Sequence, residues 1–270
     1  MTNLNVNKSL FDLGGKVAII TGGGGMLGRE YAKAIVGAGG RAILFDILAS
    51  LEMRRRISDL GLDIGSVAGF KVDVSNAAQV RRALKSVLKK FGRIDILINN
   101  AALTDLSNRF DRFSPYEKFP EELWRREIEV TLGGAFNLAK AVIPHFKRRG
   151  SGVIVNVCSI YGIVGPDNRI YEPGKYRSLA YSTAKSGILN FTRALASYLA
   201  PFGVRVNTLT FGGVFDGHDR RFRRAYGLRA MLGRMANRQE VRGPMLFLCS
   251  DASSYMTGAN LVVDGGWSAW

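Results

Sequence analysis

Short apolar runs of strand length alternate with helix-like segments along the whole chain of 270 residues. The runs are rich in Val and Ile, as in strands buried on both faces of a parallel sheet, and the alternation supplies crossover helices. The seven runs are Lys16–Thr21, Arg41–Asp46, Gly69–Val74, Ile94–Asn99, Val153–Cys158, Val204–Thr210 and Asn260–Asp264. We therefore expect an α/β fold with a seven-stranded parallel sheet, built as a single domain over residues 1–270.

Helical patterns lie between these runs. They span Met26–Val36, Ser50–Leu60, Asn76–Phe91, Glu121–Arg149 and Ala180–Ala200. In the longest one, an apolar stripe at three- and four-residue spacing predicts the buried face. This stripe consists of Ile128, Leu132, Phe136, Ala139 and Ile143. Two connections, Leu103–Pro120 and Ile160–Leu179, are long for such a fold, and long loops at strand ends are usually functional.

A glycine-rich stretch, T-G-G-G-G-M-L-G (Thr21–Gly28), follows the first strand. Glycines between a strand and a helix typically cradle the pyrophosphate of a dinucleotide at the helix N-terminus. Two registers fit, G-x-G-x-x-G on Gly23, Gly25 and Gly28, and T-G-x-x-G-x-x-G on Gly22, Gly25 and Gly28. A third register fails because Met26 occupies a glycine position, so we expect Met26 to border the pyrophosphate with Leu27 beside it.

Asp46 ends the second strand, 18 residues after Gly28. An acid at that place accepts hydrogen bonds from the adenosine ribose and repels a 2′-phosphate, which favours NAD over NADP as the cofactor. The alternative role for Asp46 is capping of the next helix. For Asp73, followed by Val74 at the end of the third strand, a cap and an adenine contact are both open.

Two Y-x-x-x-K pairs are present, and only one suits acid/base chemistry. An ammonium group one helical turn away from a phenol lowers the pKa of the phenol. This makes tyrosine a usable acid or base near neutrality. Tyr171 and Lys175 enclose a Pro-Gly pair that breaks helices, whereas Tyr181 and Lys185 lie in a periodic helix. Ser159 follows the fifth strand, where its hydroxyl can contact a substrate oxygen or simply cap a turn.

These motifs, in this order, resemble the short-chain dehydrogenase/reductases over nearly the whole chain. The shared residues are T-G-x-x-G-x-x-G, Asp46, N-N-A-A (Asn99–Ala102), Ser159, Tyr181 with Lys185, and the C-terminal S-D-A-S-S-Y-M-T-G and V-V-D-G-G-W. The resemblance implies a doubly wound, Rossmann-type sheet with helices on both faces, and a homodimer or homotetramer.

The resemblance also implies site roles. Tyr181 would be the acid/base, Lys185 would lower the pKa of Tyr181 and hold the nicotinamide ribose, and Ser159 would orient the substrate. Further cofactor contacts would come from Asn100, Ala101, Gly212 and Val214. Segments of about 160–179 and 212–237 would cover the substrate.

The sequence departs from the family pattern at three places. Thr131 occupies the position of the usual catalytic Asn, Phe211 replaces a usual Pro, and Ser159 and Tyr181 are 22 residues apart, more than is common. The longer spacing and the ending are similar to sugar-modifying members, including oxidoreductases assigned to flagellin and surface-glycan modification. We therefore expect a carbohydrate-like substrate.

The net charge is +16, and the basic residues are densest between Asp216 and Arg242, where the sequence has eight arginines and three acids. Arginine binds phosphate and carboxylate, so we expect Arg220 and Arg224 to contact an anionic substrate such as a sugar phosphate. A solvated basic helix is the alternative.

Other functions are less consistent with the sequence. A non-catalytic NAD-binding regulator or scaffold is the main alternative, prompted by Thr131 and Phe211, but the intact Ser159, Tyr181 and Lys185 argue against it. Nucleic-acid binding would depend on the charge alone, without a supporting motif. The two cysteines and two histidines are far apart in the sequence, so we expect no metal site. The sequence shows no signal-peptide core and no apolar run of membrane-spanning length, so we expect a cytoplasmic protein.

Overall fold

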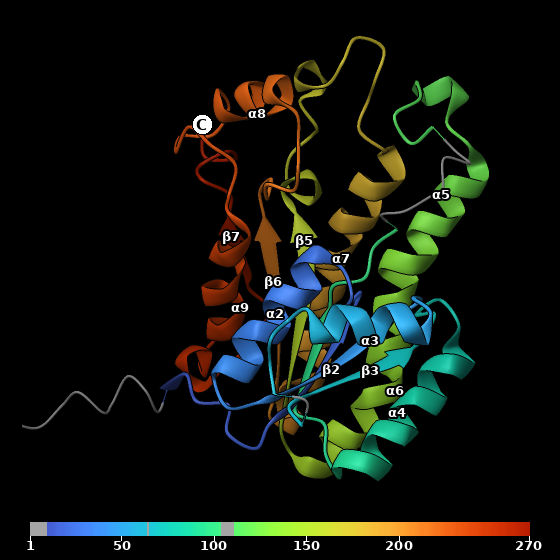
Figure 1. Cartoon of the computed structure of the whole chain (residues 1–270), viewed down its shortest axis with the longest axis vertical. Coiled ribbons are helices and arrows are strands. Elements are labelled where there is room, and N and C mark those ends of the chain that lie inside the picture. Colours follow the sequence, from blue (N-terminus) through green and yellow to red (C-terminus); the bar gives the residue numbers. More distant parts are fainter. Residues whose placement is uncertain (1–9, 64, 104–110) are drawn as a thin grey trace, which may run out of the picture.

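A computed structural model describes residues 10–63, 65–103 and 111–270 of the protein. Seven strands form one parallel sheet in the order β3-β2-β1-β4-β5-β6-β7 (Figure 1). The strands are β1 (Val17–Thr21), β2 (Arg41–Asp46), β3 (Val67–Lys71), β4 (Ile96–Asn99), β5 (Gly152–Ser159), β6 (Val204–Phe211) and β7 (Asn260–Val263). The predicted doubly wound α/β fold is confirmed.

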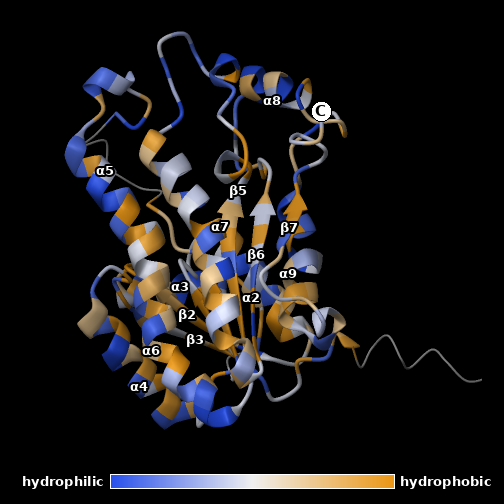
Figure 2. Cartoon of the chain, turned by 180° about the vertical axis from the view of Figure 1, so that it is seen from behind, coloured by the Kyte–Doolittle hydropathy of each residue, from blue (hydrophilic) through white to orange (hydrophobic). Residues whose placement is uncertain are grey.

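Helices cover both faces of the sheet. They are α2 (Met26–Gly37), α3 (Ser50–Ser58), α4 (Ala77–Phe91), α5 (Glu121–Ile128), α6 (Gly134–Arg149), α7 (Leu179–Leu199), α8 (Arg220–Gly227) and α9 (Arg242–Cys249). Figure 2 shows the strands mainly in the colour of apolar residues, with polar residues on the outer helices. Among the described residues, no helix combines the length and the apolar character that crossing a membrane requires.

Alternate residues of each strand enter two separate cores, because successive side chains point to opposite faces of a sheet. Ile20, Leu44 and Ile98 pack with residues of α2, α3 and α9 on one face. Ile19, Ile43 and Leu97 pack with α4, α6 and α7 on the other. Burial on both faces explains why the sequence shows continuous apolar runs instead of alternation.

The long helix expected over Glu121–Arg149 is interrupted. A π-helical turn, Glu129–Gly133, separates α5 from α6. A π turn holds more residues than an α turn, so it rotates the face of every residue that follows. The expected apolar stripe is therefore wrong at Phe136, which is 51% exposed, while α6 buries Leu138, Val142 and Phe146.

The order of the strands locates the site. β1 lies between β2 and β4, so the chain reverses direction across the sheet at this point, and ligands of such folds bind beyond the carboxyl ends of the strands there. The segments that follow β1, β4, β5 and β6 consequently meet at one edge. Helix α8 lies over the carboxyl ends of β5 and β6 (Figure 1).

Candidate active site

The glycine loop after β1 is shaped for close backbone approach. Gly22 has φ of +61°, a conformation that favours glycine. A Cβ on Gly28 would lie 2.4 Å from the carbonyl oxygen of Gly22, so only glycine fits where α2 passes this close to the loop. Helix α2 begins at Met26, and its N-cap, Gly25, has no side chain that could accept a hydrogen bond from the first N–H groups of the helix. This cradle fits a pyrophosphate.

Asp46 is attached to the same loop. Its Oδ2 accepts a hydrogen bond from the Gly24 N–H at 2.9 Å, and its Oδ1 accepts one from Leu48 N–H at 3.3 Å. It does not cap α3, whose N-cap is Ala49. Arg56, which the sequence interpretation overlooked, donates to the Gly24 carbonyl at 2.8 Å. The ribose end of the loop therefore carries a fixed carboxylate and a nearby guanidinium.

Asp73 lies in a turn after β3. Its Oδ1 accepts hydrogen bonds from the N–H and the hydroxyl of Ser75, while the N-cap of α4 is Asn76. The neighbouring Val74 is buried. The turn role of Asp73 is thus visible in the structure, and its adenine contact stays a prediction.

The end of β4 is fastened to the glycine loop. The Thr21 hydroxyl accepts hydrogen bonds from the N–H groups of Asn100 and Ala101 at 2.9 and 3.0 Å. The Asn100 side chain donates to the Thr21 carbonyl at 2.9 Å. These bonds bring Asn100 and Ala101 next to Gly22, and their contacts with a cofactor stay predictions.

Ser159, Tyr181 and Lys185 come together at the end of β5. Lys185 is buried, donates to the Val157 carbonyl at 2.7 Å, and lies 5.8 Å from the centre of the Tyr181 ring. Burial alone would raise the pKa of Tyr181. The charges of Lys185 and Arg177 and a hydrogen bond with Ser159 outweigh it, so the pKa lies below that of an ordinary phenol. The arrangement can therefore exchange a proton with an alcohol or a ketone.

The second Y-x-x-x-K pair does not form this geometry. Lys175 pairs with Asp111 at 2.7 Å, and the Tyr171 hydroxyl meets the Tyr161 hydroxyl at 3.0 Å. Tyr171 follows a short 3-10 turn and is extended, so Pro173 and Gly174 have the helix-breaking effect expected from the sequence.

Thr131 is buried in the π-helical turn, and this turn packs against α7, the helix of Tyr181. Turns of this kind inside α-helices are frequent at functional sites. No hydrogen bond of the described residues joins Thr131 to Lys185, so a role in a proton relay stays a prediction.

Aromatic side chains form a cluster against which Tyr181 packs, and the sequence interpretation did not identify this cluster. Tyr171 packs on Phe222 of α8, and Tyr226 stacks on Trp267 with ring centres 4.4 Å apart. The Tyr226 hydroxyl accepts a hydrogen bond from the Gly213 N–H at 2.5 Å. Tyr161 and Tyr226 belong to one apolar cluster at this end of the sheet.

The segment after β6 runs under α8. A Cβ on Gly212 would lie 2.7 Å from the Tyr226 hydroxyl, so the chain is closely packed there. Val214 is bridged to Ala236, and Phe211, at the place of the usual proline, is buried at the end of β6. Contacts of Gly212 and Val214 with a cofactor stay predictions.

Arg220 and Arg224 lie on the exposed outer face of α8, whereas Phe222 and Tyr226 face inward. Together with Arg221, Ala225 and Leu228 they line an open surface depression. In the described part of the chain, no contact joins Arg220 or Arg224 to the Tyr181 group. Their role in substrate binding therefore stays a prediction.

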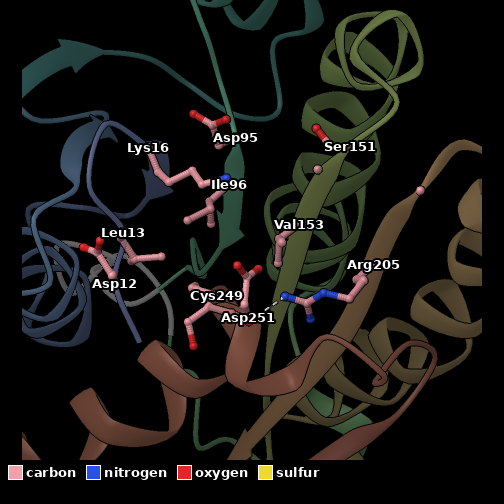
Figure 3. A pocket seen from close by; sticks show the side chains of 13 residues that line it. Asp12, Leu13, Lys16, Asp95, Ile96, Ser151, Val153, Arg205, Cys249 and Asp251 are labelled. Atoms are coloured by element: carbon pink, nitrogen blue, oxygen red, sulfur yellow. Dashed lines mark hydrogen bonds between the residues drawn. The ribbon is translucent and has the colours of Figure 1, made fainter. Parts of the chain in front are cut away.

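A cavity of about 130 Å³ lies at the opposite edge of the sheet, where the strands begin (Figure 3). Two of its charged side chains are already engaged: Asp95 pairs with Arg93 and Arg149, and Arg205 donates to the Leu248 and Ser250 carbonyls. It is therefore a structural feature remote from the cofactor loop. No group of three His, Cys, Asp or Glu residues suited to a metal ion occurs among the residues described.

Comparisons with known proteins agree with this fold. A family model described as enoyl-(acyl carrier protein) reductase matches residues 25–268. Trans-4-hydroxycyclohexanecarboxylate dehydrogenase of Sinomonas cyclohexanicum is 35% identical over 94% of this chain and 93% of its own length. D-threitol dehydrogenase of Mycolicibacterium smegmatis is 33% identical over 96% and 95%.

Solved structures show the same fold with either nicotinamide cofactor. A gluconate 5-dehydrogenase from Burkholderia cenocepacia, in complex with NADP and tartrate, superposes with a TM-score of 0.83 at 29% identity, covering 98% of this chain and 99% of that one. A short chain dehydrogenase from Leptospira borgpetersenii with bound NAD+ has a TM-score of 0.83 at 31% identity, covering 99% and 97%.

Proposed function

The chain belongs to the short-chain dehydrogenase/reductase family, and on that premise we propose that it interconverts a secondary alcohol and a ketone of a carbohydrate-like substrate with NAD as cofactor. Family membership makes it an NAD(P)-dependent oxidoreductase acting on alcohols. The observation that carries the proposal is the meeting of Ser159, Tyr181 and Lys185 at the carboxyl edge of the sheet, next to the glycine loop.

In this proposal Tyr181 moves the proton. Its phenolate accepts the hydroxyl proton during oxidation, and its phenol returns a proton to the carbonyl oxygen during reduction. Ser159 holds the reacting oxygen, and Lys185 keeps the phenolate stable and contacts the nicotinamide ribose. A bound nicotinamide dinucleotide supplies the hydride acceptor or donor. Thr131 is a further candidate for conducting the proton.

The choice of NAD is supported by Asp46. Its carboxylate is fixed at the ribose end of the glycine loop by the Gly24 N–H, so a 2′-phosphate would meet a negative charge there. Arg56 lies near the same loop, but its Nε is already paired with Glu52 at 2.7 Å. We therefore propose that NADP binds more weakly than NAD.

The proposed substrate class is supported by the aromatic cluster near Tyr181 and by the relatives. An aromatic ring such as that of the half-buried Tyr171 suits the apolar C–H face of a sugar or a saturated ring. Relatives of this chain are named for a polyol and for a ring alcohol. The exposed Arg220 and Arg224 extend the proposal to substrates that carry a phosphate.

We also propose a homodimer or homotetramer. Trp124 on α5 and Phe136 on α6 are 40% and 51% exposed, and in the proposed assembly a second copy of the chain would cover them. Light scattering on the purified protein measures the assembly directly, and Phe136→Glu should lower the mass of a dimer or tetramer that uses this face.

A substrate screen tests the proposed function. Formation of reduced cofactor is followed by absorbance with NAD or NADP across polyols, sugars, sugar phosphates and hydroxylated ring carboxylates. We expect turnover of at least one secondary alcohol, faster with NAD. Binding of NAD without turnover of any member of the panel would favour the alternative, a non-catalytic NAD-binding regulator.

A further inference from the structure

Arg177 places a second positive charge on the Tyr181 ring. It directly precedes Ser178, the N-cap of α7. The central carbon of its guanidinium lies 4.0 Å from the centre of the Tyr181 ring, compared with 5.8 Å for the ammonium nitrogen of Lys185. It lies 5.6 Å from the centre of the Tyr161 ring. The arginine charge is therefore closer to this ring than the lysine of the Y-x-x-x-K pair.

The charge of Arg177 has no carboxylate partner among the described residues. Its Nε is shielded from solvent and donates a hydrogen bond to no atom of the described chain. The charge of Glu127 acts on Arg177, but the oxygens of Glu127 are engaged by Arg112 and by the Ser178 hydroxyl. A cation that is partly buried without a counter-charge is unfavourable, and a phenolate beside it removes this cost.

The three phenols around Arg177 respond differently. Burial raises the pKa of Tyr161 and of Tyr171, which share a hydrogen bond with each other. Only for Tyr181 do the neighbouring charges outweigh burial. The stacked guanidinium therefore acts on the phenol that also has Lys185 and Ser159 beside it.

Groups from several elements take part in this balance. Lys185 comes from α7 itself, Ser159 and Cys158 from β5, Tyr171 from the segment after β5, and Tyr31 from α2. Burial raises the pKa of the Cys158 thiol, so it stays neutral near pH 7. Lys185 and Arg177 are consequently the two charges that favour the phenolate.

We propose that Arg177 is a second cation for the Tyr181 phenolate, a positioning residue that acts together with Lys185. The inference rests on the proposed role of Tyr181 as acid/base. A guanidinium keeps its charge at every pH at which the protein is folded, so its effect on the phenolate is constant. The assignment lies outside the Y-x-x-x-K pattern, because Arg177 precedes the helix.

The side chain of Arg177 is not what anchors its segment. The backbone N–H of Arg177 donates to the Asn168 side chain at 2.9 Å, and the Tyr176 N–H donates to the Phe113 carbonyl at 2.9 Å. Both bonds survive a change of the Arg177 side chain. Variants at this position therefore separate the charge from the fixation of the loop.

The first experiment is the pH dependence of kcat/KM for alcohol oxidation in Arg177→Met and Arg177→Lys. Because oxidation needs the phenolate, the rate rises with pH through the Tyr181 pKa, and loss of the cation should move this rise to higher pH by about one unit. Arg177→Lys should restore part of the shift. Arg169→Met, an exposed arginine of the same segment, should leave the profile unchanged.

A uniform loss of rate in Arg177→Met, with the rise at the wild-type pH, would overturn the proposal by showing a structural role. A loss limited to KM for anionic substrates, again without a shift, would also overturn it and would make Arg177 a substrate anchor.

The second experiment needs no substrate, so it stays informative even if the proposed reaction is not found. The ultraviolet absorbance of tyrosinate is titrated in wild type and Tyr181→Phe, and again in Arg177→Met with and without Tyr181→Phe. Subtracting the Tyr181→Phe titration from the titration of its parent protein leaves the ionisation of Tyr181. We expect Tyr181 to ionise at higher pH in the Arg177→Met background than in wild type. Ionisation at the same pH in both backgrounds would overturn the proposal.

Discussion

Glu127, buried in α5, accepts a hydrogen bond from the hydroxyl of Ser178, the N-cap of the helix that carries Tyr181. The same hydroxyl accepts a hydrogen bond from the Tyr181 N–H at 3.2 Å. Glu127 also pairs with Arg112 at 3.1 Å. The first turn of α7, and with it the backbone of Tyr181, is thus fixed to α5 through one serine.

Ser178→Ala should weaken this attachment. Loss of an N-cap typically costs about 1 kcal/mol of stability, and here it also leaves an oxygen of the buried Glu127 without its donor. We expect a lower free energy of unfolding in urea and a lower kcat, because Tyr181 is less well fixed. Ser182→Ala is the matched control, since the Ser182 hydroxyl donates to the Ser178 carbonyl in the same turn of helix. Equal effects of both variants would contradict this account.

Asp46→Ser should change the cofactor preference. Without the carboxylate at the ribose end of the loop, the repulsion of a 2′-phosphate disappears, and NAD loses an acceptor for its ribose hydroxyls. We expect the ratio of the Kd values for NADP and NAD to fall by about tenfold, or about 1.4 kcal/mol. Fluorescence titration with each cofactor measures the ratio. Asp59→Ser, an exposed carboxylate at the end of α3, should leave it unchanged.

Asp95 should make stability depend on pH at the acid end. It accepts a hydrogen bond from the Val17 N–H at 2.8 Å and pairs with Arg93 and Arg149. Burial alone would raise the pKa of Asp95, but these partners hold it below its ordinary value of 3.8. Its contribution is therefore complete above about pH 4 and is lost as the pH falls through the lowered pKa.

Asp95→Asn should accordingly cost roughly 1–3 kcal/mol at neutral pH. Urea unfolding at a series of pH values should show the difference from wild type shrinking below pH 4. A difference that stays constant down to the acid limit of folding would show that packing, and not the carboxylate charge, is responsible.

Thr131 can be tested by two substitutions. If its hydroxyl helps to conduct the proton, Thr131→Ala should lower kcat with little change in KM. Thr131→Asn should keep the wild-type kcat or raise it. Steady-state kinetics and thermal unfolding of both variants separate chemistry from stability, since Thr131 is buried. An alanine variant with wild-type kcat would remove Thr131 from the mechanism.

The sheet could be predicted from the sequence because its signal is local. Runs such as V-A-I-I-T in β1 are buried on both faces, and continuous apolar runs of this length are typical of the strands of a parallel sheet. The glycine loop is equally local, because the left-handed φ of Gly22 and the close contact of Gly28 each require glycine.

Other features depend on packing that the sequence does not encode locally. The π-helical turn shifts the phase of α6 and exposes Phe136, and no residue type marks such a turn. Arg177 comes to lie against the Tyr181 ring only because the segment after β5 folds back onto it. The arginine cluster predicted basic residues near the substrate, but only the fold shows that Arg220 and Arg224 lie on the outer face of α8.

Tyr181→Phe tests the central claim most directly, because it removes one hydroxyl and keeps the ring that packs under Arg177. NAD binding is measured by fluorescence titration, and turnover by the absorbance of the reduced cofactor with the best alcohol from the screen. Tyr255→Phe, a fully exposed tyrosine, is the control. The account predicts wild-type NAD affinity with turnover abolished in Tyr181→Phe only, and turnover at the wild-type rate in that variant would contradict it.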